Sequence, residues 1–255
     1  MTVHFIGAGP GAADLITVRG LRLLSAAPVC LYAGSLVPRD LLASCPPGAT
    51  LVDTADLTLD QIVATMVDAH ARGQDVARLC SGDPAVFSAV AEQLRRLDAA
   101  SVPYEIVPGV PAFAAAAAAL RRELTVPAVG QTVILTRAQA RSTPMPPGEE
   151  LTRLGRSGTT IVLHLAAGRI YQVVAQLLPG YGPDCPVAVV AYASRPGEVI
   201  LRGTLAGIAD AVAAAGVRRT AVIIVGRVLA AAGFPDSHLY SAARDRSGTA
   251  GGSPA

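Results

Sequence analysis

Three short glycine-bearing segments carry the clearest chemical signal in this sequence. Each follows an apolar run of the strand type: Gly7-Ala8-Gly9-Pro10-Gly11 after residues 3–6, Ser81-Gly82-Asp83-Pro84 after residues 75–80, and Pro108-Gly109-Val110-Pro111 after residues 104–107. We call them the first, second and third glycine loops. Glycine lets a backbone approach a ligand closely, and the carboxyl ends of parallel strands are the usual ligand sites of open sheets. The set therefore predicts a ligand crevice at one edge of a sheet.

The first glycine loop does not fit the dinucleotide-binding fingerprint. Ala12 occupies the position of the third glycine, and Pro10 lacks the backbone N–H that a pyrophosphate would need. The second predicted strand ends in Tyr32-Ala33-Gly34, which offers no carboxylate to a ribose hydroxyl. NAD is therefore not the expected cofactor.

The residue types that are missing exclude several reaction classes. The chain has no lysine, so all 21 basic residues are arginine, and neither a Schiff-base lysine nor a P-loop lysine is possible. It has no asparagine, which excludes Cys-His-Asn catalysis. Its four cysteines form no C-x-x-C pair. No two potential metal ligands have the close spacing typical of a metal site, so none is expected.

The overall composition predicts a folded chain without nucleic-acid or membrane partners. Of 255 residues, 51% are apolar and 16% are charged, which favours a substantial core over disorder. A net charge of +2 without a basic cluster argues against nucleic acid. The longest apolar stretch, residues 110–120, is too short to cross a bilayer, and no signal-peptide pattern begins the chain. We therefore expect a cytoplasmic location.

Alternating strand and helix patterns predict an α/β fold with a parallel sheet in the first half. The expected strands are 3–6, 28–32, 50–53, 75–80 and 104–107, and the expected helices are 17–25, 60–72, 85–97 and 112–120. After a break near Pro127 and Gly130, a less regular pattern predicts a mixed sheet. Its expected strands are 132–136, 160–165, 187–192, 199–202 and 221–225, with helices at 169–178 and 205–215. We expect lobes at 1–127 and 128–232 and a flexible tail at 233–255.

These motifs closely resemble the signature of the tetrapyrrole (corrin/porphyrin) methylases. The resemblance rests on the three glycine loops, with Asp14-Leu15 beside the first, and covers about residues 2–229. Three further segments are similar to the branch that methylates corrinoid precursors of cobalamin: Tyr32-Ala33-Gly34-Ser35-Leu36, Glu123-Leu124-Thr125-Val126-Pro127, and Thr136-Arg137 through Arg141-Ser142-Thr143-Pro144. The resemblance implies two α/β/α lobes, with a largely parallel sheet in the first and a mixed sheet in the second. It also implies an active site in the cleft between them and a homodimer.

The resemblance further implies S-adenosylmethionine as the methyl donor and S-adenosylhomocysteine as the product. The positions that match cofactor contacts are Gly9, Pro10, Gly11, Ser81, Gly82, Asp83, Val86, Phe87, Pro111, Ala112, Leu165, Ala193, Thr220 and Ala221. Backbone amides at helix starts suit the methionyl carboxylate. The implied reaction is an in-line displacement, in which a ring carbon of a tetrapyrrole attacks the sulfonium methyl.

No general base is carried over from the family, because Ala33 stands where several relatives have an acidic residue. The candidate catalytic residues are Tyr32, Ser35 and His164. A lysine-free chain must meet the acetate and propionate groups of a tetrapyrrole with arginine, which pairs with carboxylates bidentately. The candidate substrate-binding residues are Arg39, Arg137 and Arg141.

These residues are compatible with more than one acceptor and more than one role. The acceptor could be metal-free or carry cobalt. The chain could belong to another branch of the fold, which methylates a different ring position, RNA or a protein. It could also be a non-catalytic module that binds S-adenosylmethionine.

Overall fold

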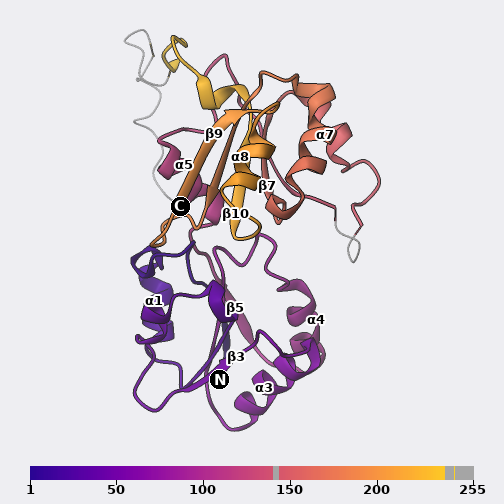
Figure 1. Cartoon of the computed structure of the whole chain (residues 1–255). Coiled ribbons are helices and arrows are strands. Elements are labelled where there is room, and N and C mark those ends of the chain that lie inside the picture. The colour runs from indigo at the N-terminus through magenta and orange to yellow at the C-terminus, as the bar shows by residue number, and fades with distance from the viewer. Residues whose placement is uncertain (140–143, 239–243, 245–255) are drawn as a thin grey trace. The chain divides into compact units, whose positions relative to one another are not determined.

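The computed structural model describes residues 1–139, 144–238 and 244, which form two five-stranded sheets flanked by helices (Figure 1). The chain divides into two compact units. The first comprises Met1–Leu120, Val190–Ile200 and Thr220–Val222, and the second comprises Arg121–Val189, Leu201–Arg219 and the described residues from Ile223 onward. The first unit therefore includes two short segments from the second half of the chain.

The first sheet is parallel throughout, with the strand order β3-β2-β4-β1-β5. Its strands are β1 (Val3–Gly7), β2 (Val29–Tyr32), β3 (Thr50–Asp53), β4 (Val76–Cys80) and β5 (Tyr104–Val107). All residues of β1 and β4 are buried, as expected of strands that helices cover on both faces. From β1 the chain moves to one side for β2 and β3, and from β4 it moves to the other side for β5. The topological switch of the sheet therefore lies between β1 and β4, where ligands of such sheets bind.

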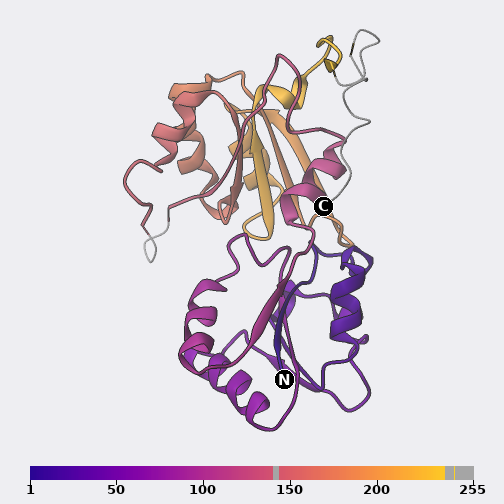
Figure 2. The same ribbon diagram turned by 180° about the vertical axis from the view of Figure 1, so that it is seen from behind.

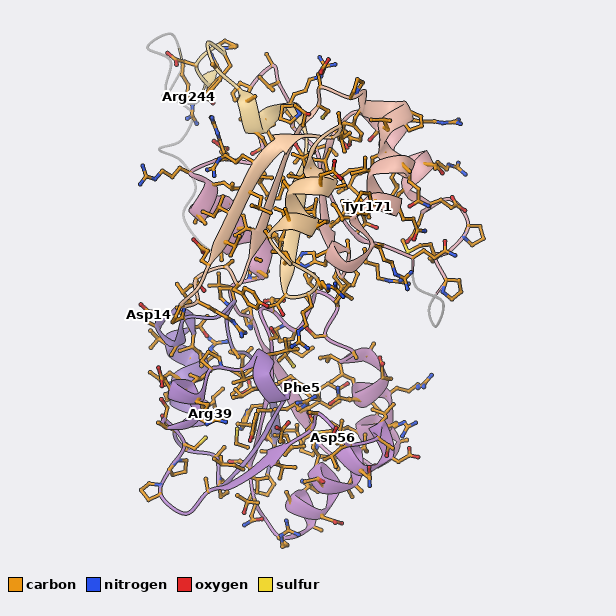
Figure 3. The ribbon with its side chains drawn as sticks, in the orientation of Figure 1. Phe5, Asp14, Arg39, Asp56, Tyr171 and Arg244 are labelled. Carbon is orange, nitrogen blue, oxygen red and sulfur yellow. The ribbon has the colours of Figure 1, made fainter. Side chains whose placement is uncertain are left out.

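Successive residues of β1 point to opposite faces of the sheet and enter different cores. Ile6 packs in a core with residues of α1 (Val18–Leu24) and α2 (Arg39–Leu42). Phe5 packs in a core with residues of α3 (Leu59–Ala71) and α4 (Ala91–Ala99). Figures 1 and 2 show α1 on one face and α3 with α4 on the other. Figure 3 labels Phe5 within the sheet and Arg39 on the side of α1.

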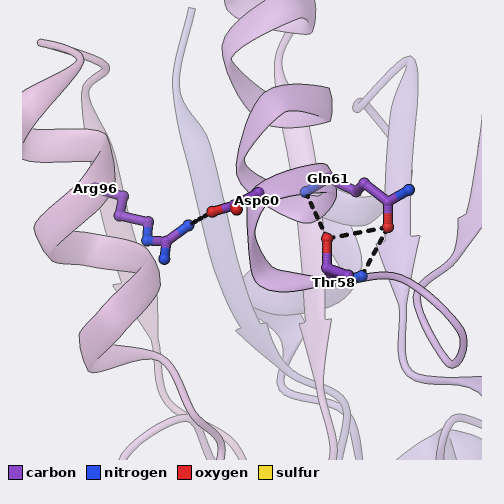
Figure 4. Close-up of polar contacts among 4 residues, drawn as sticks. All are labelled: Thr58, Asp60, Gln61 and Arg96. Atoms are coloured by element: carbon purple, nitrogen blue, oxygen red, sulfur yellow. Dashed lines mark hydrogen bonds and ion pairs between the residues drawn. The ribbon is translucent and has the colours of Figure 1, made fainter.

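The start of α3 shows why this helix begins where it does. Thr58 accepts a hydrogen bond from Gln61 N through Oγ1 (3.3 Å), and Gln61 Oε1 accepts one from Thr58 N (2.8 Å), which completes a capping box (Figure 4). In the same turn, Asp60 forms an ion pair with Arg96 of α4. Both side chains of the pair are solvent-accessible, so the capping box contributes more to stability than the ion pair does.

The second sheet has the order β6-β7-β10-β8-β9 and is mixed, since β6 and β7 are parallel whereas β7 and β10 are antiparallel. Its strands are β6 (Val133–Arg137), β7 (Thr160–His164), β8 (Pro186–Ala191), β9 (Val199–Thr204) and β10 (Ala221–Val225). The helices that follow β5 are α5 (Ala112–Leu120), α6 (Leu151–Leu154), α7 (Ile170–Tyr181) and α8 (Ile208–Ala214). The predicted parallel first sheet and mixed second sheet are thus confirmed.

One predicted helix begins later than the sequence pattern indicated. We expected a helix over 85–97, but α4 begins at Ala91. The carboxylate of Asp83 accepts a hydrogen bond from Ala85 N (2.7 Å), and Phe87 and Ala89 have φ values of +52° and +50°. Residues with positive φ cannot continue a right-handed helix, so the chain forms turns here until Val90. The short helices α2 and α6 were not predicted, and most of the predicted tail lies outside the described residues.

Candidate active site

The three glycine loops meet at the carboxyl edge of the first sheet, because β4, β1 and β5 are adjacent strands. Gly9 and Gly82 exchange two backbone hydrogen bonds, Gly9 N to Gly82 O at 3.2 Å and Gly82 N to Gly9 O at 2.8 Å. This pair joins the first and second loops at the topological switch of the sheet. The predicted convergence of the loops is therefore confirmed.

The loops approach one another so closely that glycine is required at two positions. A Cβ on Gly7 would lie 2.5 Å from Gly109 Cα, and a Cβ on Gly109 would lie 2.3 Å from Gly82 O. Gly82 itself has a φ of +68°, which other residues adopt with strain. Bare backbone thus lines this part of the edge.

Asp83 connects the second and third loops. Its Oδ2 accepts a hydrogen bond from Gly109 N at 2.7 Å, while its Oδ1 accepts the bond from Ala85 N. Beside this link, a Cβ on Gly82 would meet Ala112 N at 3.5 Å, which places the first residue of α5 next to the second loop. Asp83 therefore organises the loops through both carboxylate oxygens.

A fourth loop, residues 192–198 between β8 and β9, packs against the first glycine loop within the first unit. Ser194 Oγ accepts a hydrogen bond from Ala12 N at 3.0 Å, and a Cβ on Gly11 would lie 2.9 Å from Ala193 O. Tyr192 N donates to Thr220 O at 2.9 Å. The structure thus brings predicted cofactor residues from both halves of the chain together.

A cavity of about 960 Å³ opens beside these loops in the first unit. It is bounded by the first glycine loop, the end of β2, the α2 region, β3 and the 192–198 loop. Its lining residues are Gly11, Tyr32, Gly34, Val37, Pro38, Arg39, Leu42, Ala43, Leu51, Asp53, Tyr192, Arg195 and Pro196. Three residues predicted from the sequence line this cavity together: Tyr32 as a catalytic candidate, Arg39 as a substrate-binding candidate and Gly11 as a cofactor-binding candidate.

Two charged lining residues were not identified from the sequence. Asp53 ends β3 beside Tyr32, and its Oδ1 accepts hydrogen bonds from Gly34 N and Ala55 N, each at 2.9 Å. Arg195 donates from Nη2 to Leu36 O at 2.6 Å, and burial lowers the pKa of its guanidinium. A search of strand ends could have found Asp53. Arg195 carried no such signal, because its sequence context indicated only a turn.

The other predicted site residues lie in both units of the chain. Val86 donates its N–H to Asp83 O at 3.2 Å in the second loop, and Phe87 follows it with an exposed ring. Arg137 lies in the second unit and donates to the backbone oxygens of Ala138 and Pro144. Ser35 lies in a 3-10 turn at Gly34–Leu36, and Arg141 lies outside the described residues.

His164 is the last residue of β7 and Leu165 follows it, both in the second unit. Burial lowers the pKa of His164, since a charged imidazolium is costly in an apolar environment. Leu165 is 72% exposed and has a φ of +52°, a backbone conformation that residues other than glycine adopt with strain. The cofactor-binding role of Leu165 stays a prediction.

Within residues 1–139, 144–238 and 244, no group of three or more His, Cys, Asp or Glu side chains could hold a metal ion. No helix in the same ranges is long and apolar enough to span a membrane.

Comparison with known proteins agrees with this geometry. A family model described as tetrapyrrole (corrin/porphyrin) methylases matches residues 2–209. The chain is 68% identical over 246 residues to a precorrin-4 C(11)-methyltransferase from Rhodococcus erythropolis, covering 96% of this chain and 99% of that one.

Two solved structures share the fold. The first, a cobalt precorrin-4 methyltransferase described as a cobalamin biosynthetic enzyme, superposes with a TM-score of 0.87 at 45% identity and covers 89% of this chain and 95% of its own. The second, a uroporphyrin-III C-methyltransferase from Thermus thermophilus complexed with S-adenosylhomocysteine, has a TM-score of 0.75 at 30% identity and covers 90% of this chain and 93% of its own. The chain belongs to the tetrapyrrole (corrin/porphyrin) methylase family.

Proposed function

We propose that this chain is an S-adenosylmethionine-dependent methyltransferase that methylates C-11 of precorrin-4, giving precorrin-5 in cobalamin biosynthesis. The observation that carries the proposal is the junction at Gly11, which belongs to the first glycine loop and also lines the 960 Å³ cavity. A donor held by the loops and an acceptor held in the cavity would be neighbours. The 68% identity to a precorrin-4 C(11)-methyltransferase supports this choice of acceptor.

The glycine loops fit S-adenosylmethionine in their chemistry. Gly9 and Gly82 leave the backbone bare at the switch point, and Ala112 begins a helix whose first amides suit a carboxylate. Ala193, Thr220 and Ala221 lie in the segments that join the first unit from the second half of the chain. When bound, S-adenosylmethionine supplies an activated methyl group on sulfur.

The residues of the chain bind and orient the reactants and exclude water. Holding two reactants in near-attack geometry can supply ~7–11 kcal/mol of a barrier, so no strong base is needed for the transfer itself. In this proposal Tyr32 forms the wall of the cavity at the end of β2, and Arg39 pairs with an acceptor carboxylate. The proton that the acceptor loses passes to water or to one of its own carboxylates.

Further features belong to the same proposal. The acceptor is metal-free, which the higher identity to the precorrin-4 enzyme (68%) than to the cobalt precorrin-4 enzyme (45%) supports. The cytoplasmic location stays a prediction, and so does the homodimeric state, which the resemblance implies. The lobes at 1–127 and 128–232 and the tail at 233–255 stay predictions as well.

The proposal is tested first by titration calorimetry with S-adenosylhomocysteine, with NADH in a parallel titration. We expect S-adenosylhomocysteine to bind and NADH not to bind, and the reverse result would refute the assignment. Methyl transfer from labelled S-adenosylmethionine to freshly prepared precorrin-4 is then followed by mass spectrometry. If S-adenosylhomocysteine binds but no methyl group is transferred to any corrinoid precursor, the chain is a non-catalytic binding module.

A further inference from the structure

We propose that Arg195 binds a carboxylate of the tetrapyrrole acceptor and helps to set acceptor specificity. This inference rests on the proposed function and deepens it, because sequence analysis assigned acceptor binding to other arginines. Arg195 reaches the cavity from the loop between β8 and β9, far along the chain from the strands that form its other walls.

The loop that carries Arg195 is fixed by several hydrogen bonds. Arg195 N donates to Tyr192 O at 2.9 Å, and Ser194 N donates to Glu198 Oε2 at 2.8 Å. Ser194 Oγ also accepts the bond from Ala12 N at 3.0 Å. The backbone of Arg195 is therefore tied both within its own loop and to the first glycine loop.

The side chain of Arg195 is fitted to the surface it crosses. A Cβ on Gly11 would lie 2.3 Å from Arg195 Cγ, so only a glycine at position 11 leaves room for this arginine. At the far end, Arg195 Nη2 donates to Leu36 O at 2.6 Å. The guanidinium is thus held between the first glycine loop and the turn that follows β2. Because the side chain is already ordered, it would lose little conformational entropy when a ligand binds.

The charge balance of the cavity wall favours an anion. Arg39 and Arg195 line it together with a single carboxylate, Asp53. Oδ1 of that carboxylate already accepts two backbone N–H groups. The wall therefore carries more positive than negative charge, which suits a ligand rich in acetate and propionate groups.

The position of the guanidinium within this wall adds a second reason. Arg195 is half-buried, and burial lowers its pKa. A bound carboxylate would offset the cost of removing the charge from water. A guanidinium presents its N–H donors in a planar, rigid fork that matches the two oxygens of a carboxylate.

The first test compares Arg195→Lys and Arg195→Gln with Arg95→Lys and Arg95→Gln, which change an exposed arginine of α4 outside the cavity. Kinetics with precorrin-4 give the acceptor KM and kcat, and calorimetry gives the Kd of S-adenosylhomocysteine. Because a hydrogen bond between charged groups is lost, we expect the Arg195→Gln variant to raise the acceptor KM roughly 10- to 100-fold. The Kd of S-adenosylhomocysteine should change less than about twofold, and the Arg95 variants should match the wild type.

Two outcomes of this test overturn the proposal. One is an unchanged acceptor KM. The other is a loss of S-adenosylhomocysteine affinity as large as the rise in KM, which would make Arg195 a brace for the first glycine loop. Arg195→Lys keeps the charge without the planar fork, so it should give an intermediate KM if bidentate pairing matters.

A second measurement separates this inference from the proposed function. Uroporphyrin III and its methyl ester are titrated against the wild type and the Arg195 variants by fluorescence. We expect the free acid to bind the wild type at least about tenfold more tightly than it binds the Arg195→Gln variant, and the ester to show no such difference. Equal binding of the acid to both proteins would refute a carboxylate-binding role. The free acid could bind the wild type more tightly than the Arg195→Gln variant while the enzyme methylates no corrinoid. In that case the proposed function fails and the carboxylate-binding role of Arg195 stands.

Discussion

Replacing Gly109 by alanine tests whether the three glycine loops form one rigid assembly. The added Cβ would lie 2.3 Å from Gly82 O and 2.7 Å from Gly7 Cα, and both of these atoms are backbone. Ordinary contacts between nonbonded heavy atoms need about 3.5 Å, so the loops would have to separate by about 1 Å. No flexible side chain can absorb that movement.

The cost of Gly109→Ala follows from two contributions. Overpacking a tightly packed site costs typically ~1–3 kcal/mol. The separation also weakens the bond from Gly109 N to Asp83 Oδ2, and a hydrogen bond to a charged group is worth ~1.5–3 kcal/mol. Together they predict a loss of ~2.5–6 kcal/mol in the free energy of unfolding, with the upper end reached if the hydrogen bond breaks. In a chain of this length each kcal/mol lowers Tm by ~2–4 °C, so Tm should fall by roughly 5–24 °C.

The assay combines thermal unfolding with titration calorimetry of S-adenosylhomocysteine. Because the displaced loops include Gly82, we expect the affinity for S-adenosylhomocysteine to fall at least about tenfold along with Tm. Gly203→Ala in β9 is the matched control, since its Cβ would meet nothing nearer than Ile208 Cδ1 at 3.8 Å. This control should keep the wild-type Tm within about 2 °C. A Gly109→Ala protein with unchanged Tm and unchanged affinity would refute the argument.

Three further predictions concern single interactions. Asp83→Asn replaces one carboxylate oxygen by an NH₂ donor, which must then face the N–H of Gly109 or of Ala85. The free energy of unfolding in urea should therefore fall by ~1–3 kcal/mol, and an unchanged unfolding midpoint would contradict this. Thr58→Ala removes the capping box of α3 and should lower the free energy of unfolding in urea by ~0.5–2 kcal/mol. The affinity for S-adenosylhomocysteine should not change, and a loss of affinity would contradict the placement of α3 outside the site. Burial raises the pKa of Cys80 from its ordinary value of 9.0 to about 11, so between these values the native thiol keeps a proton that the unfolded chain loses. The Cys80 contribution to the free energy of unfolding should therefore fall as pH rises from 9 to 11, and a Cys80→Ser protein should lack that part of the slope.

Much of the site was accessible from the sequence because it is built from local patterns. Glycine-bearing loops after apolar strands predicted a ligand edge, and the parallel strands placed all three loops at the same end of the sheet. The predicted start of α4 was wrong because it depends on a contact that is not local. The carboxylate of Asp83 makes hydrogen bonds to Ala85 and Gly109 in place of capping a helix, and its partner on the third loop is distant in sequence.

The sequence by itself indicated the two α/β lobes and the backbone-lined loops, since periodicity and glycine placement depend only on near neighbours in the chain. The family followed from the resemblance of its motifs to a known signature. Only the tertiary structure decided that β4, β1 and β5 are adjacent, and that the loop at 192–198 returns to the first glycine loop. It also decided that Arg195 crosses Gly11 to reach Leu36 and that Asp53 shares a cavity with Tyr32. These contacts join residues far apart in sequence, and their geometry depends on how strands order themselves and how closely backbones pack, which no local pattern encodes.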